Sequence, residues 1–261
     1  MEYLKFIESV LVPQAGVSLR EFYQKFCDWV DIGIERKPDA LPASLADLET
    51  EKSLRDLITN QYPDHGIWGE EFGAYKIDCD YVWVLDPLDG TREFLAKKPG
   101  SFGSLMGVLD KRKAVIGAIA DPINDRVYLS DQTNPRPNIL KTLQDNIIAC
   151  TNLDGMFKLS FTQALKDRTK NITSELNCMG FRSVIEGSVN AFVEIRIRLH
   201  DISPALPILI NAGIKVLDLK GSNYANKQFN VSQAETQRYE EIASYSPDLP
   251  DQIVTLYQEA A

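Results

Sequence analysis

Zinc-binding and disulfide patterns are missing from the sequence, and so are long apolar runs. The four cysteines form no Cys-x-x-Cys pair and only two histidines are present, so we expect neither a structural zinc site nor a disulfide framework. The first 14 residues carry charges at Glu2, Lys5 and Glu8, which argues against a signal peptide or a membrane span. We therefore expect a cytoplasmic protein with no membrane partner.

Positive charge is also scarce. The 28 lysines and arginines are outnumbered by 37 aspartates and glutamates, which gives a net charge of -9. A general nucleic-acid-binding protein would show a basic footprint, so we expect no nucleic-acid partner. A small anionic substrate remains compatible with this charge, because bound metal ions reverse the local field.

The apolar spacing predicts helices in the first part of the chain. Residues 1–35 show helical periodicity, which we expect to be broken near Pro13 and Gly16. A capping box from Ser44 to Asp47 predicts the start of the next helix.

Short apolar runs separated by glycines and polar turns come next and are typical of an antiparallel or mixed sheet. Beyond the polar segment 131–144, helical and strand patterns alternate as α/β units. We therefore predict an α/β chain with α+β layering, in which two sheets are covered by helices. Its expected lobes are an N-terminal α+β lobe over residues 1–134 and a C-terminal α/β lobe over residues 135–261.

The stretch VWVLDPLDGT carries the main functional signal. Its apolar run places Asp86 at the end of a strand, where ligands of helix-covered sheets often bind. Asp86 and Asp89 offer the hard oxygen ligands that Mg²⁺ prefers. Gly90 allows the backbone to approach a ligand closely, and Thr91 is placed to cap a helix whose first N–H groups would face a phosphate. The stretch indicates metal-assisted phosphoryl chemistry, although turn formation alone explains Asp and Gly here equally well.

Two further acidic positions are weak signals on their own. Glu70 and Glu71 follow a short apolar strand, and such a pair is usually a solvated turn. Asp201 is expected just before a helix that is apolar almost all round, where a carboxylate also stabilises the helix start.

The ordered combination of these motifs resembles the inositol monophosphatase family, from about residue 15 to residue 221. The family's G-E-E motif, its complete D-P-[IL]-D-G-T signature and an altered W-D-x-A motif occur here as Gly69-Glu70-Glu71, Asp86-Pro87-Leu88-Asp89-Gly90-Thr91 and His200-Asp201-Ile202-Ser203. The family's upstream lysine and aspartate and its late substrate-contacting glutamate fall on Lys37, Asp47 and Glu194.

The resemblance implies an αβαβα sandwich and a Mg²⁺-dependent, lithium-sensitive phosphomonoesterase, commonly a homodimer, with two or three metal ions per site. The metal ligands it implies are Glu70, Asp86 and the Leu88 carbonyl for one ion, and Asp86, Asp89 and Asp201 for another. Most of these lie in the expected N-terminal lobe, whereas Asp201 and the substrate contacts come from the second lobe.

The same resemblance implies roles around the substrate. It makes Asp47, Glu70 and Thr91 the catalytic set, in which Asp47 and Thr91 polarise the attacking water while a metal lowers its pKa. The substrate, a small-molecule phosphate monoester, would be bound by Gly90, Thr91, Glu194 and Asp201.

Elementary electrostatics supports the metal assignment, because four carboxylates gathered in one pocket repel each other strongly without cations. Two alternatives stay open for single residues. Asp47 is also the capping-box carboxylate of its helix, and His200 is either a packed substitute for the family's tryptophan or a group that orients Asp201 or contacts the leaving group.

Other functions were weighed against this one. The haloacid-dehalogenase phosphatases carry a D-x-D-G-T motif, but the spacing here is one residue longer, and short motifs alone are unreliable. A degenerate family member acting as an interaction protein is the non-enzymatic alternative. Among substrates, an inositol phosphate is the first expectation. Histidinol phosphate is the main alternative, and Arg196 and Arg198 would suit the second phosphate of a 3′(2′),5′-bisphosphate nucleotide.

Overall fold

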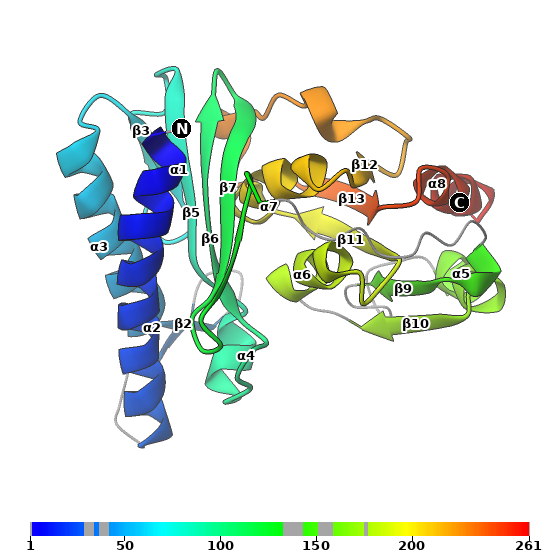
Figure 1. Ribbon diagram of the computed structural model, residues 1–261, viewed down its shortest axis with the longest axis horizontal. Helices are drawn as coiled ribbons and strands as arrows, with labels where there is room; N and C mark the ends of the chain where they lie inside the picture. The colour runs from blue at the N-terminus through cyan, green and yellow to red at the C-terminus, as the bar shows by residue number, and fades with distance from the viewer. Residues whose placement is uncertain are drawn as a thin grey trace.

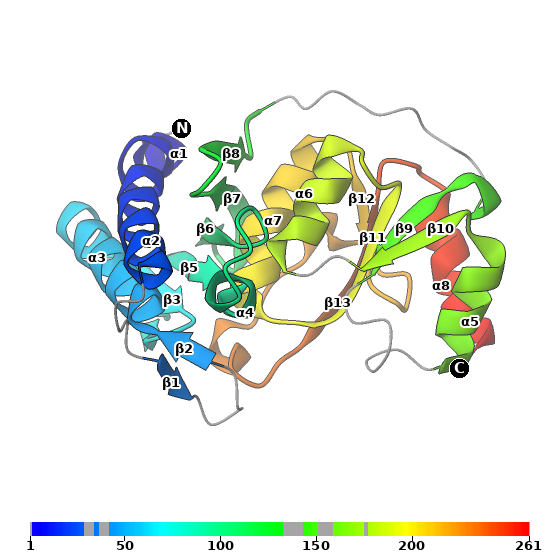
Figure 2. The ribbon, with the colours of Figure 1, turned by 90° about the horizontal axis from the view of Figure 1, so that it is seen from below.

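The computed structural model describes residues 2–28, 34–36, 42–132, 143–150, 159–174 and 177–260. Five layers follow one another in Figure 1: helices, a six-stranded sheet, helices, a five-stranded sheet and helices. Helices α2 and α3 cover the outer face of the first sheet, α6 and α7 lie between the sheets, and α5 and α8 cover the second sheet (Figures 1 and 2). The predicted arrangement of two helix-covered sheets is confirmed.

The first sheet contains the strands that lead to the acidic motifs. Its order is β4 (Gly73–Tyr75), β3 (Gly66–Gly69), β5 (Tyr81–Asp89), β6 (Gly103–Asp110), β7 (Lys113–Asp121) and β8 (Arg126–Leu129). Only the β3–β5 pair is parallel within it, so both strands direct their carboxyl ends to the same edge. Short runs of alternating or fully buried residues form these strands because both faces of the sheet are covered.

The second sheet is mixed. Its order is β10 (Asn171–Ser174), β9 (Ile147–Cys150), β11 (Ala191–Ile197), β13 (Tyr239–Ser244) and β12 (Lys215–Leu217). Strand β9 runs parallel to β10 and β11, whereas β13 is antiparallel to β11 and β12. The predicted alternation of helices and strands is confirmed for this half. Strands β10 and β13 and the last helix were not predicted from the sequence.

The helices differ from the expectation in two places. The N-terminal helical path is not broken near Pro13 and Gly16, because α2 runs through both; the irregularity is a π turn just before the proline, where the Val12 N–H bonds to the Ile7 carbonyl. Helix α7 begins at Leu199, so Asp201 lies inside this helix and not just before it. The helices are α1 (Glu2–Phe6), η1 (Ile7–Leu11), α2 (Val12–Cys27), α3 (Leu45–Gln61), α4 (Thr91–Leu95), α5 (Leu159–Arg168), α6 (Cys178–Glu186), α7 (Leu199–Asn211) and α8 (Leu249–Glu259).

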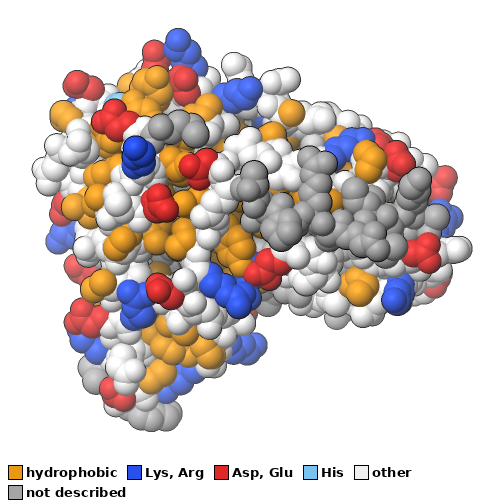
Figure 3. Space-filling view, in the orientation of Figure 1, with side chains coloured by type: hydrophobic (Ala, Val, Ile, Leu, Met, Phe, Trp, Pro, Cys, Tyr) orange, Lys and Arg blue, Asp and Glu red, His pale blue; other side chains and the backbone are white. Residues whose placement is uncertain are grey.

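Shorter elements complete the described chain. They are the hairpin β1 (Ile34–Arg36) and β2 (Pro42–Ser44) and the 3₁₀ turns η2 (Leu143–Asp145), η3 (Tyr224–Asn226) and η4 (Val231–Gln233). On the face drawn in Figure 3, acidic and basic side chains alternate, and hydrophobic side chains appear over the N-terminal helices. Within the described ranges no helix has the length and apolar character needed to cross a bilayer.

Helix α7 connects the two halves of the molecule. It is buried along almost its whole length and packs against β5, β6 and β7 of the first sheet and β12 and β13 of the second. It therefore brings its first turn to the edge where β3 and β5 end. The expected lobe boundary between residues 134 and 135 lies outside the described residues, and the division into lobes stays a prediction.

Candidate active site

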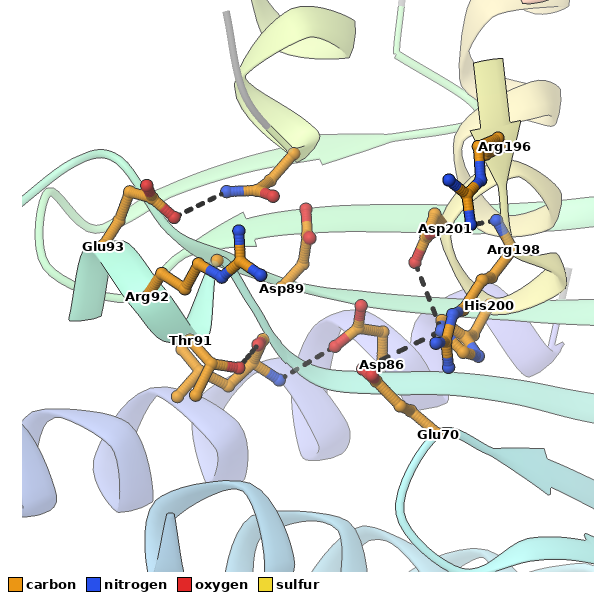
Figure 4. A pocket seen from close by; sticks show the side chains of 13 residues that line it. Glu70, Asp86, Asp89, Thr91, Arg92, Glu93, Arg196, Arg198, His200 and Asp201 are labelled. Carbon is orange, nitrogen blue, oxygen red and sulfur yellow. Dashed lines mark hydrogen bonds and ion pairs between the residues drawn. The ribbon is translucent and has the colours of Figure 1, made fainter. Parts of the chain in front are cut away.

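A pocket of about 200 Å³ opens where β3 and β5 end (Figure 4). Its walls come from these strands, from α4, from the start of α6, and from the β11–α7 connection. The lining residues are Glu70, Asp86, Leu88, Asp89, Gly90, Thr91, Arg92, Glu93, Asn177, Arg196, Arg198, His200 and Asp201.

A one-residue bulge in β5 places two aspartates on the same side. Asp86 pairs with Leu105 of β6 and Asp89 with Gly103, so three steps along β5 match two steps along β6. Residues three apart in a regular strand face opposite sides of a sheet. The extra residue cancels that offset. Strand β5 therefore continues past Asp86, where the sequence predicted its end, and presents both carboxylates to the pocket.

Glu70 is positioned by a buried carboxylate that we did not identify from the sequence. Glu51 of α3 is fully buried, pairs with Arg55 at 2.7 Å and accepts the Glu71 N–H at 2.7 Å. A Cβ on Gly69 would lie 1.9 Å from this carboxylate, so only glycine fits there. The turn that carries Glu70 is thus held between the end of β3 and helix α3.

Asp47 and Thr91 form a hydrogen-bonded pair. The predicted capping box is confirmed: Ser44 donates its N–H and hydroxyl to Asp47 Oδ2, at 3.1 and 2.6 Å. The Thr91 hydroxyl lies 3.1 Å from Asp47 Oδ1 and 3.2 Å from the Leu88 carbonyl oxygen. One oxygen of Asp47 therefore accepts the capping-box bonds of its helix, while the other lies beside Thr91 of the pocket. Its role toward an attacking water stays a prediction.

The expectation that Thr91 caps α4 is wrong. Gly90, at a φ of +92°, occupies the cap position, and Thr91 is the first helical residue. Its side chain is directed to Asp47 instead. Gly90 is required there because the left-handed backbone favours glycine.

Asp201 also lies one turn further into its helix than expected. Helix α7 begins at Leu199, and Asp201 accepts the Arg198 N–H at 3.0 Å from the third helical position. This bond fixes the carboxylate at the helix start. Next to it, His200 is buried, with Nε2 at 3.5 Å from Asp201 Oδ1 and 3.8 Å from Glu70 Oε2.

The acidic side chains form two overlapping groups. Ligand atoms of Glu70, Asp86 and His200 lie within 4.8 Å of one another, and so do those of Asp86, Asp89 and Asp201. Carboxylate oxygens gathered in this way are the donors that hard divalent cations take. Asp86 belongs to both groups, which places two candidate metal positions side by side.

The pKa values of the aspartates reflect their burial and the neighbouring negative charges. Burial, followed by the charges of Glu70 and Asp89, raises the pKa of Asp86 well above its usual value. Burial and Asp201 raise the pKa of Asp89 well above its usual value, although the Cys178 N–H that it accepts acts in the opposite direction. The pKa of Asp201 is also raised, mainly by burial. Divalent cations would offset the repulsion between these buried carboxylates, so the donor set fits such ions.

Most of the predicted site residues come together. Seven line the pocket: Glu70, Asp86, Leu88, Asp89, Gly90, Thr91 and Asp201. Asp47 reaches it through Thr91. Glu194 lies in β11 opposite Glu241 and is not among the lining residues, and Lys37 lies outside the described residues.

Several pocket residues were missed from the sequence. Asn177 holds a positive φ of 60° and donates to Glu93 at 3.0 Å, and the next residue donates its N–H to Asp89. Arg92 lines the pocket directly after Thr91. Arg92 could have been predicted from its position next to the signature motif. Asn177 is distant from that motif in the sequence and reaches the pocket only in the folded chain.

A family model described as "Inositol monophosphatase family" matches residues 5–250. The protein named bifunctional phosphatase IMPL2, chloroplastic, from Arabidopsis thaliana is 27% identical over 84% of this chain and 65% of its own length. A histidinol-phosphatase from Mycobacterium tuberculosis is 24% identical over 74% of this chain and 80% of its own.

The fold has close counterparts among solved structures. An inositol monophosphatase from Zymomonas mobilis superposes with a TM-score of 0.77 at 21% identity, covering 98% of both chains. At this identity the likeness concerns the fold alone. The chain spans just under two thirds of the length of the plant relative.

Proposed function

The chain belongs to the inositol monophosphatase family, and from this premise we propose that it is a Mg²⁺-dependent phosphatase of small-molecule phosphate monoesters. The observation that carries the proposal is the pair of ligand groups that share Asp86. Two adjacent cations stabilise both the attacking and the leaving oxygen of an in-line displacement. The expectations of a homodimer and a cytoplasmic location remain predictions.

The metal ions would be held by the acidic groups already described. Glu70, Asp86 and the Leu88 carbonyl would bind one ion, and Asp86, Asp89 and Asp201 a second. Bound Mg²⁺ would lower the pKa of a water molecule and neutralise phosphate charge. We propose two or three ions per site.

The protein's own groups would orient the reactants. The carboxylate of Asp47 is held by Ser44 through Oδ2, so Oδ1 is left facing the Thr91 hydroxyl. A Thr91 hydroxyl that donates to Asp47 would have its lone pairs left to accept from a water molecule, and could thereby orient a nucleophile and take up its proton. The backbone N–H groups of Gly90 and Thr91 would bind the phosphate.

An inositol phosphate-like substrate is the first assignment. Glu194, the expected substrate contact, would act from β11 as a hydroxyl acceptor. An amino-alcohol phosphate such as histidinol phosphate is the alternative that uses the same carboxylate for an ammonium group. The pocket itself favours this alternative less, because three arginines line it.

A second candidate substrate class is supported by one observation. Arg92 and Arg196 line the pocket and have no ion-pair partner within the described ranges. Unpaired guanidinium groups are suited to a second phosphate. A 3′(2′),5′-bisphosphate nucleotide would supply one.

Phosphate release from three compounds tests these assignments. Inositol 1-phosphate, histidinol phosphate and adenosine 3′,5′-bisphosphate would be compared at matched Mg²⁺. An advantage of about a hundredfold in kcat/KM for one compound, roughly 2.7 kcal/mol of transition-state discrimination, identifies the class. Slow and similar turnover of all three would reject every one of these substrates, and no release with any metal would favour the interaction-protein alternative.

A further inference from the structure

His200 is the only imidazole among the lining residues, and it faces the metal-binding carboxylates (Figure 4). Its Nε2 atom lies 3.8 Å from Glu70 Oε2 and 3.5 Å from Asp201 Oδ1. Both distances are too long for hydrogen bonds. Two atoms that each lie about 2.1 Å from one ion can be up to about 4.2 Å apart. The distance between His200 and Glu70 therefore suits two ligands of one cation, and Asp86 belongs to the same group of ligand atoms.

Packing alone does not account for an imidazole at this position. The residue is 4% exposed, and its Nδ1 atom has no hydrogen-bond partner among the described residues. A buried polar atom without a partner is unfavourable. An apolar ring would fill the same space without that cost. The polar contacts of His200 are all with the acidic site, so its chemistry belongs there.

We propose that Nε2 of His200 is a ligand of the metal held by Glu70 and Asp86. This inference rests on the proposed function, because it takes the site to be metal-dependent. It makes the two metal positions chemically different. The position formed by Asp86, Asp89 and Asp201 offers oxygen atoms alone and suits Mg²⁺. The position with His200 offers a nitrogen atom and favours first-row transition metals such as Co²⁺ or Zn²⁺.

A protonated His200 is the competing reading. An imidazolium between Glu70 and Asp201 would supply positive charge itself and would reduce the need for a cation. In that case metal binding would be weak at this position, and the ring would keep its proton when metal is added. The two readings therefore differ in what happens to the ring nitrogens.

The chain contains two histidines, which makes the ring directly observable. His65 serves as the internal control, because it precedes β3 whereas Glu70 follows it, and its Nδ1 accepts from Trp83 Nε1 at 3.1 Å. Full-length protein labelled with ¹⁵N-histidine would be titrated with Zn²⁺, and the ring nitrogens followed by NMR. We expect Nε2 of His200 to shift on binding while His65 stays unchanged.

Calorimetry of the same titration distinguishes a failure of this inference from a failure of the proposed metal dependence. Zn²⁺ binding with both imidazoles unchanged would overturn the inference and leave the proposed metal dependence standing. No binding of Zn²⁺, Co²⁺ or Mg²⁺ would overturn both.

Variants sharpen the test of metal preference. His200→Gln keeps a polar side chain but removes the imidazole, and we expect it to weaken Co²⁺ binding by about tenfold or more while changing Mg²⁺ binding by less than about threefold. His65→Gln is the matched control and should change neither. Circular dichroism of the metal-free variants checks folding. Equal losses for Co²⁺ and Mg²⁺ in His200→Gln would show that the residue acts by packing and would overturn the inference.

Discussion

The two walls of the pocket differ in how their side chains and backbone are held. In the β5 wall, from Asp86 to Thr91, the polar side chains are fixed: Asp86 accepts the Leu88 N–H, Asp89 accepts the Cys178 N–H and Thr91 bonds to Asp47. In the β11 wall, from Arg196 to Asp201, Arg196 adopts a φ of +65° beside a register shift. Rigid, satisfied groups suit chemistry that every substrate shares, whereas the strained backbone at Arg196 is a feature of the kind found where a particular ligand is recognised.

The largest expected effect is in the β5 wall. Asp86→Asn would remove a ligand shared by the two proposed metal positions, so we expect Mg²⁺-supported turnover to fall by about a thousandfold or more. The metal-free variant should be at least as stable as the parent, because a carboxylate with a raised pKa has been removed. Steady-state kinetics and chemical unfolding measure both. The control is Asp125→Asn, at an exposed side chain. Near-parental turnover of Asp86→Asn would contradict the placement of a shared metal ligand in the β5 wall.

The next effect concerns a buried carboxylate outside the pocket. Glu241 lies in β13 opposite Glu194, is fully buried and has no hydrogen-bond partner among the described residues. Burial raises its pKa to about 8 from 4.5, and its charge contributes to the raised pKa of Tyr224. Like Asp86, it is a buried carboxylate with a raised pKa, but it lies outside the pocket.

The sign of the pH effect follows from the raised pKa. Between about pH 4.5 and pH 8 the folded protein keeps the Glu241 proton and the unfolded chain has lost it. The free energy of unfolding therefore falls as the pH rises through this window, by on the order of a few kcal/mol from this group. Glu241→Gln should flatten that slope in denaturant titrations at pH 5 and pH 8. An identical slope in parent and variant would contradict the prediction.

A smaller effect is expected from the hydroxyl of Thr91. Thr91→Ala removes the group that bonds to Asp47, and we expect kcat to fall by about a hundredfold with little change in KM, since the contact acts in the transition state. Thr91→Ser keeps the hydroxyl and should retain most of the rate. A change confined to KM would instead assign the residue to phosphate binding.

The smallest expected effect is in the β11 wall. Arg196→Gly relieves a positive φ, which we expect to stabilise the fold by about 1 kcal/mol, while removing a guanidinium that would bind a second phosphate. Arg196→Ala removes the same charge without relieving the backbone. Both variants should lower kcat/KM for the bisphosphate by about tenfold and leave inositol 1-phosphate unchanged. Equal losses for both substrates would contradict the proposal that the β11 wall distinguishes substrates.

Local signals in the sequence predicted the β5 wall well. The capping box at Ser44 and the apolar run before Asp86 depend on neighbouring residues, so their patterns are readable. The bulge after Asp86 is different, because it is defined only by pairing with β6. The contact between Glu51 and Gly69 likewise forms only in the folded chain, and no periodicity in the sequence predicts it.

The β11 wall was harder to predict for the same reason. Helix α7 starts before Asp201 because Asp201 itself bonds to the Arg198 N–H, and a helix that is apolar almost all round shows no clear first turn. The side-chain direction of Glu194 depends on its pairing with β13. Its role in substrate binding stays a prediction.

The bulge between Asp86 and Asp89 makes strand register, as well as residue type, a determinant of this site. Three steps along β5 separate the two aspartates, and the extra residue is what keeps both on one face. If the same sequence paired with β6 without the bulge, Asp89 would turn to the opposite face of the sheet although every side chain was kept. Natural or designed variation in this segment therefore has to preserve the mismatch in residue count between β5 and β6 in addition to the two carboxylates.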